Sequence, residues 1–123
     1  MAAKTASSRA EFAKQAYKWI VKYKFDGIDI NWEYPGFEDG KNPGEPEDVE
    51  NYVHFIKKLK TYFSSKSTES GKELLVTAAV GAPASRRKHS YPKTKEICDI
   101  LDYIHLMTYD FHGGWENVMG HHS

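Results

Sequence analysis

The stretch FDGIDINWEYP, residues 25–35, decides which class of fold this chain adopts. Within it, apolar residues alternate with acidic or amide residues at a period of two, which is the side-chain period of a β-strand. The apolar positions are Ile28, Ile30 and Trp32, and the polar positions between them are Asp29, Asn31 and Glu33. The stretch therefore predicts a strand with one apolar face and one face that carries a row of polar side chains.

Helical patterns flank this strand on both sides. Before it, Ser8-Arg9-Ala10-Glu11 has the S-x-x-E form of a capping box, and the apolar residues that follow at helical spacing predict a helix over residues 9–23. After a loop over residues 35–46, rich in Pro and Gly, a second apolar series predicts a helix that reaches Phe63. Pro46 favours the start of that helix because proline fits the first helical turn. The two acidic residues after Pro46 also favour a helix start, because carboxylates are stabilised near a helix N-terminus.

Two further apolar runs predict two more strands, over residues 74–80 and 103–110. The first run is nearly continuous, as is typical of a parallel strand buried on both faces. Between them, residues 81–91 predict a loop and residues 92–101 a short helix. The order α-β-α-β-α-β indicates an α/β fold with a parallel sheet, either doubly wound or closed into a barrel. Both architectures place their sites at the carboxyl ends of the strands.

The composition excludes several functional classes. At 123 residues the chain is at most one domain. Lys+Arg and Asp+Glu both number 17, and this balance argues against a nucleic-acid partner. The longest apolar run, residues 74–80, is too short to cross a membrane.

The N-terminus lacks the apolar core of a secretory signal, so the chain is expected either to stay in the cytosol or not to be the whole precursor. Cys98 has Ile97 and Ile100 as neighbours and is expected to be a buried structural thiol.

The polar row of Asp29, Asn31 and Glu33 has residue types that general acid–base chemistry needs. A carboxyl beside another carboxyl, or in a poorly solvated site, has a raised pKa, and this is how a glutamic acid is kept protonated as a general acid. The residues alone leave a structural alternative open. In that alternative, Asp26 and Asp29 bind backbone amides at the end of a strand, and Glu33 is solvated.

The same stretch closely resembles the active-site strand of glycoside hydrolase family 18, the chitinase family, whose pattern is D-x-x-D-x-D-x-E. Asp26, Asp29 and Glu33 match this pattern, and Asn31 departs from it. MTYDFHGGWE, residues 107–116, resembles the sixth-strand segment of the same family. The resemblance implies a (β/α)8 TIM barrel, of which this chain would supply about strands 4 to 6 with the helices between them. Because a complete barrel needs about 250 residues, residues 1–123 are expected to be a fragment of a single catalytic domain, or a truncated gene product.

The resemblance also implies a mechanism, the retaining, substrate-assisted hydrolysis of β-1,4 bonds between N-acetylglucosamine units of chitin. Glu33 would be the general acid and then the general base. Asn31 would replace the aspartate that binds the acetamide nitrogen, and Asp29 would lie behind it. Tyr109 would bind the acetamide oxygen. The other sugar-binding positions that the resemblance implies are Tyr34, Met107, Thr108, Asp110 and Trp115, and Asp26 would be structural.

Asn31 leaves the activity open. An amide carries no charge to oppose a developing cation, so we expect a slower chitinase. The alternative is a chitin-binding, lectin-like protein with weak or no turnover, and a third possibility is a truncated product without a stable fold. Chitin or chito-oligosaccharides would be the partner, no cofactor is implied, and the location implied by the family is extracellular.

Two remaining clusters are expected to have no separate chemistry. His112, His121 and His122 lack the spacing of a zinc motif, so loop packing or sugar contact is expected of them. Ser85-Arg86-Arg87-Lys88-His89 is expected to form a solvated basic loop, with anion binding as the alternative.

Overall fold

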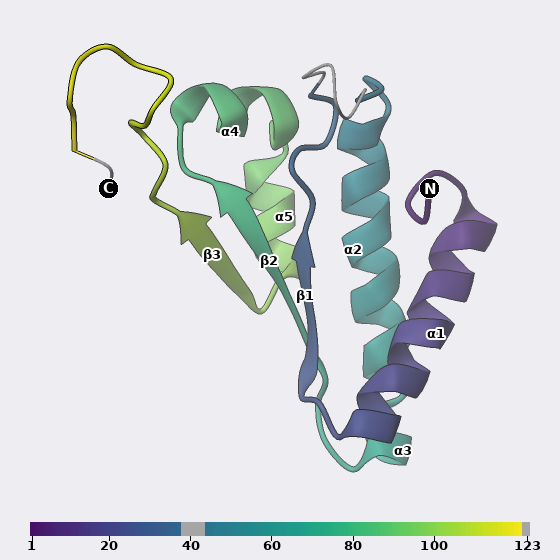
Figure 1. Cartoon of the computed structure of the whole chain (residues 1–123). Coiled ribbons are helices and arrows are strands. Elements are labelled where there is room, and N and C mark those ends of the chain that lie inside the picture. Colours follow the sequence, from purple (N-terminus) through teal and green to yellow (C-terminus); the bar gives the residue numbers. More distant parts are fainter. Residues whose placement is uncertain (38–43, 122–123) are drawn as a thin grey trace.

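The computed structural model of the chain describes residues 1–37 and 44–121. It contains a three-stranded parallel sheet in the order β1-β2-β3. The strands are β1 (Gly27–Asn31), β2 (Leu75–Gly81) and β3 (Tyr103–Met107). The helices are α1 (Ala6–Tyr23), α2 (Asp48–Ser65), α3 (Ser67–Ser70), α4 (Ala84–Ser90) and α5 (Thr94–Ile100). Because the strands are parallel, their carboxyl ends lie at one edge, and α4 lies at that edge beyond β2 (Figure 1).

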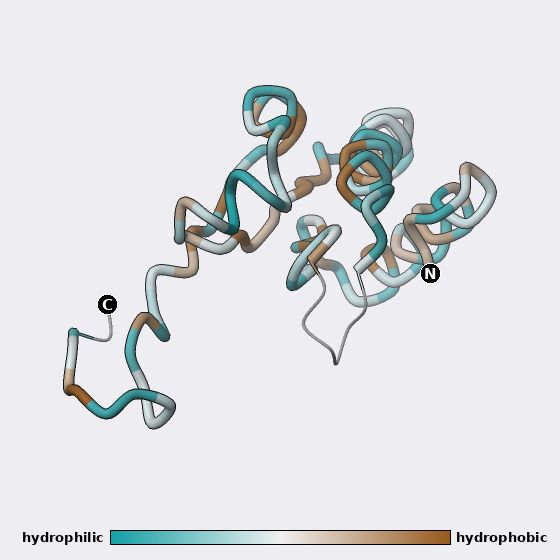
Figure 2. The backbone as a smooth tube through the Cα atoms, turned by 90° about the horizontal axis from the view of Figure 1, so that it is seen from above, coloured by the Kyte–Doolittle hydropathy of each residue, from teal (hydrophilic) through white to brown (hydrophobic). Residues whose placement is uncertain are grey.

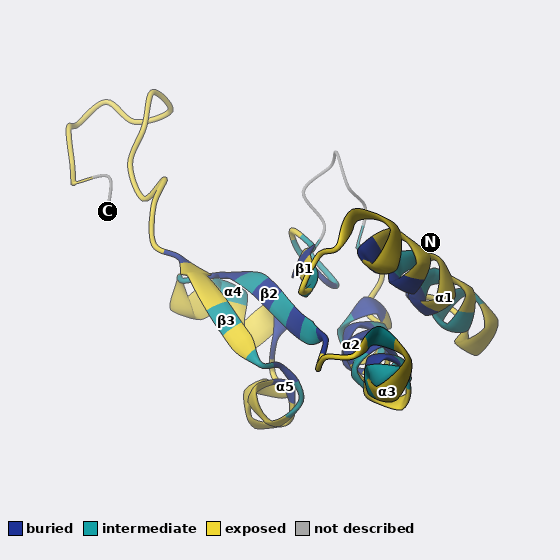
Figure 3. Cartoon of the chain, turned by 90° about the horizontal axis from the view of Figure 1, so that it is seen from below, coloured by how far each residue is buried: buried dark blue, intermediate teal, exposed yellow. Residues whose placement is uncertain are grey.

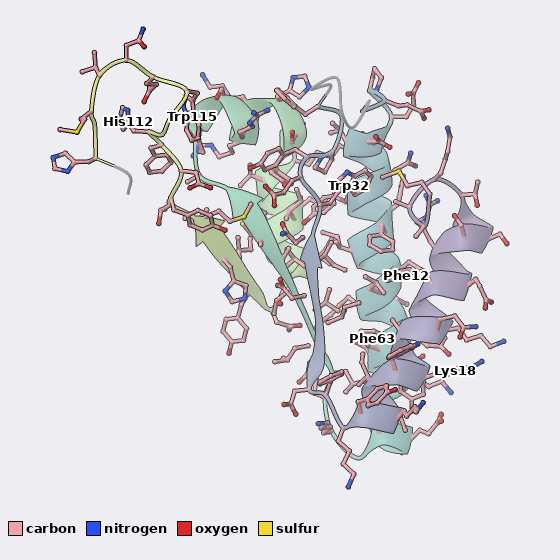
Figure 4. The ribbon with its side chains drawn as sticks, in the orientation of Figure 1. Phe12, Lys18, Trp32, Phe63, His112 and Trp115 are labelled. Atoms are coloured by element: carbon pink, nitrogen blue, oxygen red, sulfur yellow. The ribbon has the colours of Figure 1, made fainter. Side chains whose placement is uncertain are left out.

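The core lies between one face of the sheet and the long helices. Along β2, the buried residues Val76, Ala78 and Val80 alternate with half-buried ones, so one face of this strand is fully buried and the other only partly. The buried apolar residues of α2 that cover this face are Tyr52, Val53, Phe55, Ile56, Leu59 and Phe63. Phe12 of α1 meets Phe55 edge to face, with ring centroids 5.0 Å apart. Figure 4 shows Phe12 and Phe63 at the packed side of α1 and α2.

α1 begins at Ala6 instead of Arg9, so the predicted capping box was wrong in its position. Thr5 is the N-cap residue, and its Oγ1 accepts a hydrogen bond from the backbone N–H of Ser8 at 3.1 Å. The Ser8 hydroxyl accepts in turn from the backbone N–H of Thr5 at 3.0 Å. Ser8 therefore closes the capping box rather than opening it, because its hydroxyl fills the role that a Glu or Gln side chain usually has.

Residues 84–90 and Cys98 also differ from expectation. Residues 84–90 form α4 where a loop was predicted. Cys98 is exposed and is not the buried thiol that was expected. Ile97 faces the core with 3 % of its surface exposed, and the next residue on a helix points about 100° away from it.

The segment after β3 is exposed throughout residues 108–121 (Figure 3). Seen from above, it runs away from the rest of the molecule (Figure 2). Within the described ranges, no helix has the length and apolar character needed to cross a membrane.

Candidate active site

The polar row of β1 lies on the face of the sheet that the helices do not cover. Ile30 is 8 % exposed and belongs to the core, and Ile28 and Trp32 pack partly against it. Asp29 and Asn31 lie between these residues along the strand and are exposed. The alternation read from the sequence is therefore confirmed for these two faces.

Glu33 lies just beyond the end of β1, where the side-chain amide Nδ2 of Asn31 donates to its Oε1 at 3.1 Å. The pKa of the Tyr34 phenol is raised, mainly by burial and next by its interaction with Glu33. The Tyr34 phenol is therefore held neutral near the Glu33 carboxylate. The peptide bond between Glu33 and Tyr34 is cis.

Asp29 is tied across the sheet to the other two strands. Its Oδ1 accepts a hydrogen bond from the Thr77 hydroxyl of β2 at 2.6 Å. The same oxygen lies 3.8 Å from Nε2 of His105 on β3. Thr77 and His105 were not among the residues predicted for the site. Their strands were predicted, but the register that places them near Asp29 depends on pairing between residues far apart in the sequence.

Asp26 lies at the opposite end of β1 from Glu33. Its carboxylate pairs with Nζ of Lys72 at 2.5 Å, and its backbone carbonyl accepts from the N–H of Leu75. The structural alternative expected the carboxylates of Asp26 and Asp29 to bind backbone amides. The partners recorded for both are side chains instead, while Glu33 is exposed as that alternative expected.

The predicted site residues 107–110 lie at the end of β3 or just after it. Met107 is the last residue of β3 and is 9 % exposed, and Thr108 follows it on the surface. Tyr109 is half-exposed, and its charge is one of the smaller causes that raise the pKa of Tyr34, as expected of phenols in one region. Asp110 has a positive φ of 55°, which few residues other than glycine adopt.

Trp115 lies apart from residues 107–110. It is 69 % exposed, and its ring packs so closely on Gly113 that a Cβ there would lie 2.4 Å from it. Figure 4 shows Trp115 and His112 in the segment that leaves the sheet. Nδ1 of His112 lies 2.7 Å from a carboxylate oxygen of Glu116.

In the part of the chain that the structure describes, no group of three or more His, Cys, Asp or Glu side chains could hold a metal ion. His121 is exposed, and His122 lies outside the described residues. Acid–base chemistry at the carboxyl end of β1 is what the described side chains can support.

The comparisons with known proteins concern the chain as a whole. The sequence model described as "Glycosyl hydrolases family 18" matches residues 1–123. The chain is 38 % identical over 123 residues to chitinase A1 of Niallia circulans, covering 98 % of this chain and 17 % of that protein. It is 40 % identical over 121 residues to chitotriosidase-1 of Mus musculus, covering 97 % of this chain and 25 % of that protein.

Among solved structures, chitinase ChiA74 from Bacillus thuringiensis matches with a TM-score of 0.91 and 37 % identity, over 98 % of this chain and 19 % of that one. The α/β arrangement with a parallel sheet therefore matches a part of a TIM-barrel chitinase structure. The chain spans about a quarter or less of the length of each of these proteins.

Proposed function

Because the chain belongs to glycosyl hydrolase family 18, we propose that it is part of a retaining chitinase that hydrolyses β-1,4 bonds between N-acetylglucosamine units. Residues 1–123 supply about strands 4 to 6 of a (β/α)8 barrel, as a fragment of one catalytic domain, and the protein acts on chitin or chito-oligosaccharides outside the cell. The observation that carries the proposal is the Glu33 carboxylate at the carboxyl end of β1, which accepts a hydrogen bond from the Asn31 amide at 3.1 Å.

Glu33 is the general acid and base of this proposal. Its protonated carboxyl donates a proton to the glycosidic oxygen while the bond between that oxygen and C1 breaks. The carbonyl oxygen of the substrate's own acetamide attacks C1 and forms an oxazolinium ion, so no protein nucleophile is needed. A water then attacks C1 and gives its proton to Glu33, which restores the starting state. The exposed position of Glu33 beyond β1 leaves it accessible to a substrate on that edge of the sheet.

Asn31 and Asp29 orient the acetamide in this proposal. The Asn31 amide can hydrogen-bond the acetamide, but it has no charge to stabilise the oxazolinium ion. Asp29 lies behind it in the row and supplies a negative charge. The Thr77 hydroxyl fixes the position of that charge at 2.6 Å. Turnover is therefore slower than with an aspartate at position 31.

The sugar contacts come from the segments that follow β1 and β3. Tyr109 binds the acetamide oxygen, and its exposed position just after β3 leaves it accessible to a substrate. The remaining proposed contacts are Tyr34, Met107, Thr108, Asp110 and Trp115. Asp26 is structural, which its ion pair with Lys72 at the far end of β1 supports.

The test is hydrolysis of a chromogenic chitotriose glycoside by the full-length chain that contains residues 1–123. Glu33→Gln removes the acid while keeping the shape of the side chain, and it should lower kcat by at least about 100-fold. Asn31→Asp should raise kcat. Glu47→Gln, at an exposed site on the approach to α2, is the matched control and should leave kcat unchanged. Full activity in Glu33→Gln would overturn the proposed mechanism.

A chitin-binding, lectin-like protein is the second candidate. Asn31 favours it, because an uncharged residue stands where the family pattern has an aspartate and its amide is bonded to Glu33. In that case the full-length chain and its Asn31→Asp variant both bind chitotriose in calorimetry, and neither hydrolyses it.

A further inference from the structure

One face of α4 packs against the loop that leaves β1. Arg86 and His89, one turn apart on this helix, both contact residues 34–37. The guanidinium carbon of Arg86 lies 3.5 Å from the ring centroid of Phe37 and 4.8 Å from that of Tyr34. Nε2 of His89 lies 2.8 Å from the carbonyl oxygen of Gly36. The basic segment that was expected to be a solvated loop is thus a helix with Arg86 and His89 turned onto residues 34–37.

The Tyr34 ring is enclosed from a second side by β2. A Cβ on Gly81 would lie 3.0 Å from Cε1 of Tyr34 and 3.3 Å from Cβ of Arg86. A side chain at position 81 would press on both groups unless they moved by a few tenths of an ångström. Tyr34 and Phe37 meet edge to face, with ring centroids 6.4 Å apart and an interplanar angle of 89°. Tyr34 therefore lies between the backbone of β2, the guanidinium and a second ring.

The guanidinium of Arg86 is bound mainly through these rings. Its Nη1 is buried, and within the described part of the chain no acceptor is hydrogen-bonded to it. A planar guanidinium stacks on aromatic faces, and the attraction strengthens where water is excluded. The positive charge also lowers the pKa of Tyr34, against the larger raising effect of burial. Arg86 therefore acts on the Tyr34 phenol both by contact and by charge.

We propose that Arg86 is a positioning residue, which holds the Tyr34 phenol against the Glu33 carboxylate through its stacking on Tyr34 and Phe37. In this proposal the effect of Arg86 on Glu33 passes through Tyr34. The role in catalysis rests on the function proposed for Glu33, whereas the contact between Arg86 and Tyr34 does not.

The contact is tested without reference to activity, by NMR of the full-length chain labelled with ¹³C at the ζ carbon of tyrosine. The Tyr34 signal is identified as the one that Tyr34→Phe removes. Glu33→Gln should shift this signal, because the proposal holds the phenol against the carboxylate. In an Arg86→Met background the same change should leave the signal in place. Arg86→Met keeps the apolar stem but loses the plane and the charge. An equal shift in both backgrounds would overturn the proposal.

The catalytic consequence is tested with chitotriose glycoside. Misplacing a reacting group costs rate in the bound complex, so Arg86→Met should lower kcat about tenfold and change KM by less than about twofold. Arg86→Lys, which restores the charge but not the planar stack, should recover only part of the loss. Lys88→Ala, at an exposed neighbour on the same helix, is the control and should match the parent.

Two results distinguish the positioning role of Arg86 from the proposed function. An active parent whose kcat is unchanged by Arg86→Met overturns the positioning role. An inactive parent overturns the proposed function, while the NMR comparison still decides whether Arg86 holds Tyr34 against Glu33.

Discussion

Asp102 offers the sharpest test of how the sheet is held, because its carboxylate joins α2 to β2 immediately before β3. Oδ1 accepts from Nζ of Lys60 at 2.5 Å, and Oδ2 accepts from the backbone N–H of Val76 at 2.8 Å. The Lys60 and Asp102 side chains are only 24 % and 19 % exposed, so water screens the pair weakly. Val76 is fully buried, so water cannot replace its lost acceptor.

Asp102→Ala should therefore lower the free energy of unfolding by about 3 kcal/mol. About 2 kcal/mol comes from leaving the Val76 N–H without its charged acceptor, and about 1 kcal/mol from the loss of the partly buried ion pair. Asp102→Asn keeps an acceptor for Val76 and should cost about 1 kcal/mol. The assay is urea unfolding of the full-length chain, together with hydrogen exchange of the Val76 amide, which should become faster in Asp102→Ala.

Asp99→Ala is the matched control for this experiment. Asp99 pairs with Lys95 along α5, with side chains 61 % and 89 % exposed. Exposed pairs of this kind contribute little, so the variant should unfold at the same urea concentration as the parent. The reasoning is refuted if Asp102→Ala costs less than about 1 kcal/mol, or if the Val76 amide exchanges at its original rate.

Two further predictions concern the open face and the open edges of the sheet. Thr77→Val keeps the shape of the side chain but removes the donor that holds Asp29 at 2.6 Å. It should lower kcat/KM on chitotriose glycoside by about three- to tenfold. Thr61→Val, at an exposed site of α2, should have no effect, and equal kinetics for both variants would contradict the role of Thr77. Produced by itself, the chain of residues 1–123 should self-associate, because unpaired strand edges template pairing and Tyr103 and Leu106 of β3 are 63 % and 62 % exposed; light scattering that gives a monomer at all concentrations would argue against this.

The sequence allowed the sheet to be predicted because its strands and long helices carry regular apolar patterns. The alternation in residues 27–32 and the helical spacing on α1 and α2 arise from burial against one core. The spacing of apolar residues can therefore be read directly from the sequence. α4 could not be predicted in this way. It faces the rest of the molecule through Arg86 and His89 rather than through apolar residues, so its sequence reads as a solvated basic stretch.

The candidate site was predictable only within single segments. Asp29, Asn31 and Glu33 share a strand, and their common side follows from the period of two. Thr77 and His105 come from other strands, and no local pattern links them to Asp29. Their nearness depends on the register of parallel pairing, which the packing of helices between the strands determines. Sequence reasoning therefore found the row along β1 and missed its continuation across the sheet.

Asn31 has two effects on Glu33 that oppose each other. As an amide, it always has a hydrogen to donate, so the contact at 3.1 Å needs no shared proton. An aspartate at this position could donate only when protonated, and two such neighbouring carboxyls would titrate as a pair. The amide thus makes the donor to Glu33 independent of pH but leaves the oxazolinium ion without a charge beside it. If Asn31→Asp raises kcat, the gain should come with a stronger dependence of kcat on pH, because the donor then depends on a proton that the pair can lose. A gain without any change in the pH profile would show that residue 31 acts on the substrate alone and not through Glu33.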